Sequence, residues 1–226
     1  MNRSYLNASL AIGGGTLALY YVVRDYRAWK VVALHGGAPV NVLGYLVSTL
    51  SILVLRGDRR NPKQIKDTVG GKGFLDPEAV EKRSGPVPAV AKWKVPQRQV
   101  TEKQPDNSEG LAEQFYEQAI EKHGLQLEPS LVENHISALF SNKRDPEHEL
   151  IHRHPTDGTF HLLVHPQDAK VIIENNWGEL FSVPPGWVRN NGETVLLYCP
   201  RSQEDITVFH KFLDASAAFI KSQDSN

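Results

Sequence analysis

Residues 149–165 read ELIHRHPTDGTFHLLVH, and this stretch decides the fold of the C-terminal half of the chain. Apolar and polar residues alternate with period two over 149–154 and again over 159–165, which is typical of β-strands. Residues 155–158, Pro-Thr-Asp-Gly, are turn formers. The sequence therefore predicts a β-hairpin in which His154 pairs with Thr159.

This pairing gathers histidines on one face of the hairpin. Pairing His154 with Thr159 brings His152 opposite His161, because side chains on a strand alternate between its two faces. The histidines expected on this face are His152, His154, His161 and His165. The other face is expected to carry Phe160, Leu162 and Val164 into the core.

The elements around the hairpin predict an α+β fold. A helical stripe begins at Ser108 and stops at Gly124, and the last helix begins at Ser202 and continues to Ile220. Residues 130–140 and 195–198 are expected to be strands, and 166–176 a further helix. Since this order lacks regular βαβ alternation, we expect a small antiparallel sheet covered by helices on one face.

The N-terminal region predicts a membrane anchor. Residues 4–23 contain no charge, and about 20 such residues can cross a bilayer as a helix. Arg24, Arg27 and Lys30 follow, as expected of a cytoplasmic flank. A second apolar run, 40–55, has basic residues on both sides, so it is expected to be an interfacial helix or a second membrane segment.

These patterns divide the chain into three parts. We expect a membrane anchor over 1–55, a linker rich in proline and charge over 56–107, and a globular domain over 108–226. The anchor predicts a single-pass protein of an endomembrane such as the endoplasmic reticulum. The positive flank after residue 23 places the globular domain in the cytosol.

Composition limits the classes of partner. The formal net charge is −1 and the pI is near 6.8, so the sequence offers no case for nucleic acid as a partner. The only cysteine, Cys199, excludes an internal disulfide and a CxxC metal or redox motif. Cys199 follows an apolar run, and we expect it to be a small buried hydrophobe rather than a nucleophile.

The histidine cluster can be interpreted in three ways. Imidazole has an ordinary pKa near 6.5, so it can accept and donate protons at neutral pH as a general acid or base. Three histidines can also hold a metal ion. They can equally be polar neighbours on a structural surface. Glu149 and Asp157 are the nearby carboxylates that could orient an imidazole.

Several motifs in the chain resemble those of the fungal luciferase family. They are HRHPTDGTFHLLVHPQDAK at 152–170, NNWGELF at 175–181, VLLYCPRSQED at 195–205 and FLDASAAFI at 212–220. Similar motifs lie upstream, at 24–26, at 38–45 and at Gln97-Arg98-Gln99. The resemblance covers most of the chain and is densest in its C-terminal third.

The resemblance implies a membrane-associated, O2-dependent oxidoreductase that acts on an enolisable pyrone or aromatic polyketide. It implies no organic cofactor and leaves a metal ion open. In luminous members O2 adds to 3-hydroxyhispidin, and the peroxide loses CO2. The family motifs assign catalysis to His152, His154 and His161, and substrate contacts to Trp177, Tyr198 and Arg201.

The sequence also departs from the luminous members. Glu179-Leu180-Phe181 stands where those enzymes have a His-Pro pair after Trp177-Gly178, which favours a tailoring step in fungal secondary metabolism over light emission. Two other functions stay open: a non-catalytic, membrane-tethered module that binds a ligand or protein, and a metal-dependent hydrolase or isomerase.

Overall fold

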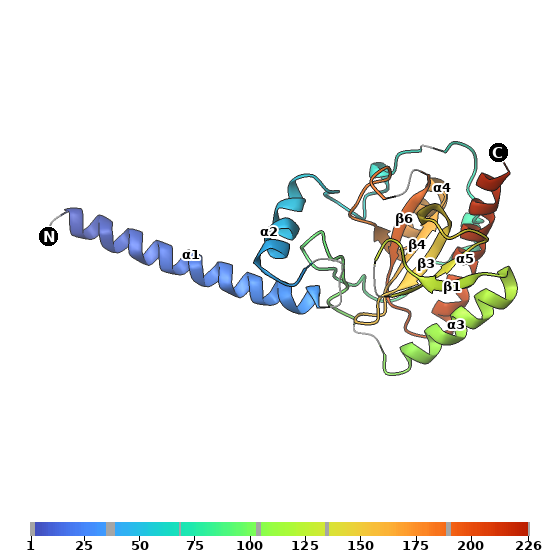
Figure 1. The fold of residues 1–226 in the computed structure, drawn as a ribbon, viewed down its shortest axis with the longest axis horizontal. Coiled ribbons are helices and arrows are strands. Elements are labelled where there is room, and N and C mark those ends of the chain that lie inside the picture. The colour runs from blue at the N-terminus through green and yellow to red at the C-terminus, as the bar shows by residue number, and fades with distance from the viewer. Residues whose placement is uncertain are drawn as a thin grey trace.

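The computed structural model describes residues 3–34, 39–67, 69–102, 105–133, 136–188 and 191–225, with side chains from residue 13 onward. Its α-helices are α1 (Arg3–Ala33), α2 (Val42–Leu50), α3 (Ser108–His123), α4 (Pro166–Glu174) and α5 (Gln203–Asp224). Its strands are β1 (Gln126–Pro129), β2 (Ser137–Phe140), β3 (Glu149–Arg153), β4 (Phe160–Val164), β5 (Gly178–Leu180) and β6 (Glu193–Leu197). Short 3-10 turns are η1 (Ser51–Leu53), η2 (Pro62–Gln64), η3 (Pro77–Ala79) and η4 (Pro146–His148). The predicted α+β class is confirmed (Figure 1).

The six strands form one antiparallel sheet in the order β1-β2-β3-β4-β6-β5. The predicted hairpin is β3–β4, and its register pairs His152 with His161. The amide of His154 donates to the carbonyl of Thr159 at 2.8 Å, and Gly158 adopts a positive φ of 71° in the turn. The hairpin and its register therefore follow the prediction.

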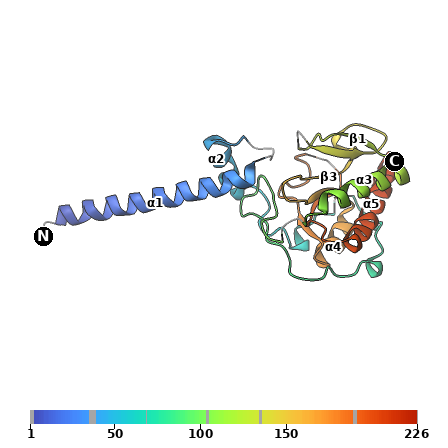
Figure 2. The ribbon, with the colours of Figure 1, turned by 90° about the horizontal axis from the view of Figure 1, so that it is seen from below.

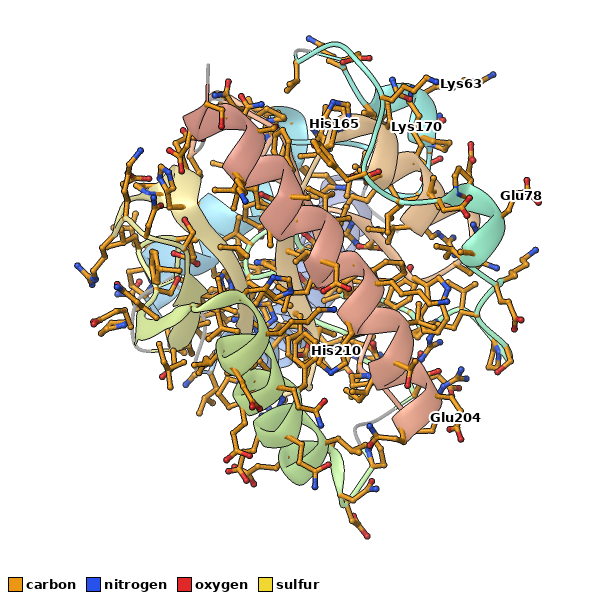
Figure 3. The ribbon with its side chains drawn as sticks, turned by 90° about the vertical axis from the view of Figure 1, so that its right-hand side faces the viewer. Lys63, Glu78, His165, Lys170, Glu204 and His210 are labelled. Atoms are coloured by element: carbon orange, nitrogen blue, oxygen red, sulfur yellow. The ribbon has the colours of Figure 1, made fainter. Side chains whose placement is uncertain are left out.

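Helices α3, α4 and α5 pack on one face of the sheet. Figure 3 shows α5 running across that face beside α3. The ring of Phe160 on β4 meets Phe115 of α3 and Phe209 of α5 edge-on, at centroid distances of 5.8 and 5.5 Å. This aromatic contact joins the two helices to the centre of the sheet.

Helix α1 extends away from the sheet, and α2 lies beside its C-terminal end (Figures 1 and 2). The two helices meet through the rings of Trp29 and Tyr45, 5.7 Å apart, and the hydroxyl of Tyr45 donates to Asp25 at 2.8 Å. Ala91 and Trp93 complete this small cluster, which is separate from the main core.

The transmembrane prediction for residues 4–23 is not supported. Within the parts of the chain that the structure describes, no helix is both long enough and apolar enough to cross a membrane. The side chains of residues 3–12 lie outside the description. The 40–55 segment folds into α2 and η1, and the nine residues of α2 are too few to span a bilayer.

The described part of segment 56–107 follows the surface of the domain and forms short 3-10 turns and an isolated β-bridge between Val90 and Gln99. Its backbone pairs with distant parts of the chain: the amide of Arg56 donates to Ser182 at 3.1 Å, and that of Arg83 donates to Asn175 at 2.9 Å. Gln97, Arg98 and Gln99 of this segment are buried. These residues therefore belong to the folded body, although the sequence assigned them to a linker.

His148 holds the end of α5 to η4, and we expect it to make stability depend on pH. Burial lowers the pKa of His148, but hydrogen bonds and attraction from Asp145 and Asp224 outweigh burial, and the pKa lies above its ordinary value. Proton binding therefore stabilises the fold. The stabilisation is complete below the unfolded pKa and is lost as pH rises through the folded pKa.

The measurement compares melting temperatures of the wild type and His148→Gln. The variant should melt lower at about pH 5.5, and the difference should shrink at about pH 8.5, above the ordinary histidine pKa of about 6.5. Lys143 also contacts Asp224 and is common to both proteins. A difference that grows with rising pH would contradict this assignment.

Candidate functional site

The three histidines that the sequence assigned to catalysis meet in the buried interior. His152 lies on β3, His154 follows it, and His161 lies on β4; their exposed fractions are 0%, 0% and 2%. The ring centroid of His161 lies 5.0 Å from that of His152 and 4.6 Å from that of His154. Phe181 packs on His161 at 4.5 Å. The predicted gathering of these three side chains is confirmed.

One hydrogen-bonded chain runs from Glu149 through His152 to His161. His152 Nδ1 lies 2.6 Å from Glu149 Oε1, and His152 Nε2 lies 3.1 Å from His161 Nδ1. Glu149 is fully buried, and it also accepts from the hydroxyl of Ser130 and the amide of Leu131, each at 2.8 Å. Ser130 and Leu131 therefore hold this carboxylate in place beside His152.

With His152 neutral, this chain sets which nitrogen of each ring carries a proton. His152 Nδ1 then donates to Glu149, and His152 Nε2 accepts from His161 Nδ1. The lone pair of neutral His161 then lies on Nε2. That atom is buried and has no hydrogen-bond partner among the described residues.

A second set of contacts surrounds His154. Its Nδ1 lies 2.8 Å from the hydroxyl of Thr159, and that hydroxyl lies 2.8 Å from Asp157 Oδ1. On the other side, His154 Nε2 lies 2.9 Å from Glu133 Oε2 and 3.3 Å from Arg98 Nη1. Arg98 also donates to Glu133 Oε1.

The electrostatics differ among the three rings. Burial, followed by the neighbouring His154 and His152, holds the pKa of His161 well below its ordinary value, so this ring is neutral at pH 7. Burial and then Arg98 lower the pKa of His154. Burial opposes protonation of His152 as well, but hydrogen bonds to Glu133 and Glu149 outweigh it and raise the pKa.

A surface groove of about 530 Å³ lies beside Arg98 and Asp157, two residues that border the cluster. Arg98 and Asp157 contribute to its wall, together with Gln99, Thr156 and residues of α1 such as Val32. Arg98 contacts His154, and Asp157 Oδ1 lies 3.7 Å from His154 Nδ1. The groove and the cluster therefore share the side chains that border His154.

The cluster contains a set of groups that could hold a metal ion. Glu133, His152, His154 and His161 each offer one ligand atom, and these atoms lie within 4.8 Å of one another. The donor set of imidazole and carboxylate suits divalent first-row transition metals. The geometry thus permits either proton transfer by the rings or coordination by them.

Other residues predicted from the sequence lie elsewhere. His165 was expected on the histidine face, but its Nε2 contacts the carbonyl of Gly70 at 3.0 Å and its ring meets Phe74 and Phe219. It is the N-cap of α4, where its Nδ1 accepts from Gln167. The turn into α4 removes it from the sheet face, so this part of the prediction was wrong.

The three residues predicted to contact substrate meet a different segment, 81–84. Trp177 Nε1 donates to the carbonyl of Glu81 at 2.7 Å, the ring of Tyr198 lies below Arg83, and Arg201 Nη2 lies 3.4 Å from Ser84. Their role in substrate binding stays a prediction. Cys199 is 1% exposed, and burial raises its pKa to about 12, which fits the expected buried hydrophobe.

Sequence reasoning missed two charged members of the site. Glu133 lies in the connection between β1 and β2, which was predicted to be part of one strand, and no motif marks it. Arg98 was quoted only as part of a resemblance, and its place in a proline-rich segment suggested a linker. Both join the cluster through contacts more than 20 residues away in sequence.

The hydroxyl of Thr159 is expected to stabilise the site, because it joins His154 to Asp157. Thr159→Val keeps the shape of the side chain and leaves a buried imidazole N–H without an acceptor. We expect the free energy of unfolding to fall by about 1–3 kcal/mol, the range for an unsatisfied buried polar group. Urea denaturation measures it, with Thr207→Val on the exposed side of α5 as the control, expected within about 0.5 kcal/mol of wild type. An equal effect of both substitutions would refute this role.

Comparison with known proteins agrees with the motifs. Residues 147–216 match the family described as Luciferase domain. The chain is 28% identical to a luciferase of Armillaria ostoyae and to one of Armillaria gallica, in each case over 97% of this chain and 89% of the relative. A luciferase of Armillaria mellea is 28% identical over 90% of this chain and 83% of the relative. No solved structure matches significantly.

Proposed function

We propose that this chain, which its sequence matches assign to the fungal luciferase family, is a luciferase-like enzyme: an O2-dependent oxidoreductase acting on an enolisable pyrone or aromatic polyketide. The observation that carries the proposal is that His161 Nε2 is buried and has no hydrogen-bond partner among the described residues. It stands at the end of the chain from Glu149 through His152, and the groove borders the neighbouring His154 through Arg98 and Asp157. A buried nitrogen without a hydrogen-bond partner destabilises the folded state, so such an atom calls for a functional explanation.

The reaction needs a base and a stabilised anion. His161 Nε2 accepts the proton of the enol, and the resulting enolate carbon donates an electron pair to O2 and forms a carbon–oxygen bond. The imidazolium of His161 then returns the proton to the peroxide. His152 and Glu149 orient the base, as a carboxylate orients an imidazole in other proton-transfer sites.

Arg98 supports this assignment from the side of the groove. Its guanidinium is buried and always charged, it lines the groove, and it contacts His154 at 3.3 Å. A fixed cation in a site of low dielectric stabilises negative charge that develops on a substrate oxygen. The groove is large enough for a bicyclic or styryl-substituted ring compound.

Replacement of His161 should separate activity from folding. His161→Asn keeps an N–H donor near the position of Nδ1 but has no atom in place of Nε2. We expect O2 uptake with a panel of hydroxylated pyrones to fall by about a hundredfold or more, the usual scale for a lost general base. Since Nε2 has no hydrogen-bond partner among the described residues, the melting temperature should change little.

His165→Asn serves as the matched control, because His165 lies outside the cluster. It should keep the O2 uptake of the wild type. Equal uptake by the wild type and His161→Asn would refute the role of the base. A wild type that binds the pyrones without O2 uptake would favour the alternative, a non-catalytic binding module.

We also propose that the exposed apolar side of α2 and η1 rests on a membrane surface. Leu43, Leu50 and Leu53 are 68%, 61% and 79% exposed. Arg24 and Arg27 of the neighbouring helix are exposed as well and would meet anionic headgroups. An amphipathic segment with a cationic flank is suited to the interface of a bilayer.

Liposome sedimentation tests this proposal. The full chain should bind vesicles that contain anionic lipid, and Leu43→Glu with Leu50→Glu should reduce the bound fraction several-fold. Leu127→Glu on β1, which replaces an equally apolar residue that is 51% exposed, should bind like the wild type. Wild-type protein that stays in the supernatant would refute the proposal.

A further inference from the structure

Three side chains of the cluster share an arrangement that proton transfer does not require. Each directs one polar atom inward, and its other polar atom is held from outside. His152 Nδ1 is held by Glu149 at 2.6 Å, His154 Nδ1 by Thr159 at 2.8 Å, and Glu133 Oε1 by Arg98. The inward atoms are His152 Nε2, His154 Nε2 and Glu133 Oε2.

Two of the inward atoms oppose each other as acceptors. The hydroxyl of Thr159 donates to Asp157, so it accepts from His154 Nδ1, and the lone pair of neutral His154 lies on Nε2. That lone pair lies 2.9 Å from an oxygen of Glu133, which also only accepts when ionised. Two acceptors at this distance repel unless positive charge offsets them. Arg98 contacts both groups from one side, and a metal ion between them would bind both lone pairs directly.

We propose that Glu133, His152 and His154 bind one divalent first-row transition metal ion. The inference rests on the proposed function, whose reaction centre it supplies with a cofactor. When the ion binds, it takes the lone pair of His152 Nε2 in place of the hydrogen bond from His161 Nδ1. Two imidazoles and one carboxylate form the ligand set of many metal sites that activate O2, and this set leaves coordination positions open for substrate and O2.

The distances fit such an ion. Bonds of about 2.0–2.2 Å place neighbouring ligand atoms roughly 3.0–3.5 Å apart in octahedral or tetrahedral geometry. Glu133 Oε2 lies 2.9 Å from His154 Nε2 and 3.7 Å from His152 Nε2. Shifts of a few tenths of an ångström would bring both pairs into this range.

The outer contacts match those that support metal ligands in proteins. A ligating histidine usually donates its second N–H to a carboxylate, a carbonyl or another oxygen, which fixes the ring and its tautomer. Glu149 does this for His152, and Thr159, backed by Asp157, does it for His154. Arg98 lies 3.3 Å from His154 Nε2 and would keep its bonds to Glu133 and the Gln97 carbonyl when the ion takes that lone pair.

His161 differs from the three ligands in this respect. Its Nδ1 is within reach of the same centre, but its outer atom Nε2 has no partner in the described part of the chain. No outer contact fixes it as a ligand, so we assign it to proton transfer beside the ion. The buried charges agree with a bound cation: Glu133 and Glu149 are both buried carboxylates, and Arg98 contacts Glu133.

The test uses the full chain, stripped with a chelator and titrated with Zn²⁺ and Co²⁺ in a calorimeter. We expect one ion per chain, and the d–d absorption of Co²⁺ should report nitrogen and oxygen ligands. Glu133→Gln, His152→Gln and His154→Gln should each weaken binding by about a hundredfold or more. Thr159→Val, which removes only an outer contact, should weaken it by about tenfold.

Matched controls define the ligand set. His165→Gln and His161→Asn should bind both ions like the wild type. Wild-type protein that binds neither ion at micromolar concentration would overturn the proposal, whether or not the variants fold. Loss of binding in His161→Asn with normal binding in His152→Gln and His154→Gln would overturn this ligand set.

The metal proposal and the proposed function can fail separately. If the stripped wild type takes up O2 as fast as the loaded protein while His161→Asn does not, the enzyme proposal stands and the metal proposal is refuted. If one ion binds and the ligand variants release it, but no pyrone supports O2 uptake, the metal proposal stands and the oxidoreductase proposal is refuted.

Discussion

The pairing of His152 with His161 across the β3–β4 hairpin is the constraint on which the site depends. Side chains alternate along a strand, so a shift of one residue would send one of these rings into the core packed under the helices. The register is fixed from the other face, where Phe160 packs between Phe115 and Phe209. The aromatic core therefore determines which imidazoles meet.

A buried polar cluster must satisfy its own charges. Glu149 is fully buried, yet Ser130, Leu131 and His152 all donate to it, and Arg98 donates to Glu133. Ionised groups without such partners would destabilise the fold by several kcal/mol. Among the described residues, two atoms of this cluster have no hydrogen-bond partner, Arg98 Nε and His161 Nε2, and of the two only His161 Nε2 belongs to a side chain that can act as a base.

The sequence predicted the hairpin, its register and three histidines of the site. The alternation of residues and the turn formers that indicate them lie within one short stretch of the chain. The sequence did not predict Glu133 or Arg98, since their role arises from contacts between distant segments. Charge-free composition also predicted a membrane span at 4–23, whereas no helix among the described residues is both long enough and apolar enough to cross a membrane. His165 was wrongly predicted to lie on the histidine face. Strand β4 ends at Val164 and α4 begins at Pro166, so the alternation of side chains along the strand does not reach His165.

The region that matches the luciferase domain does not contain the whole site. It begins at residue 147 and includes His152, His154 and His161, whereas Arg98 and Glu133 precede it. The groove also takes part of its wall from α1. A chain reduced to the matched region would keep the imidazoles but lose the guanidinium and the carboxylate that face His154. Similarity to the Armillaria luciferases over most of the chain fits this geometry, because the residues that surround the histidines come from the N-terminal half as well.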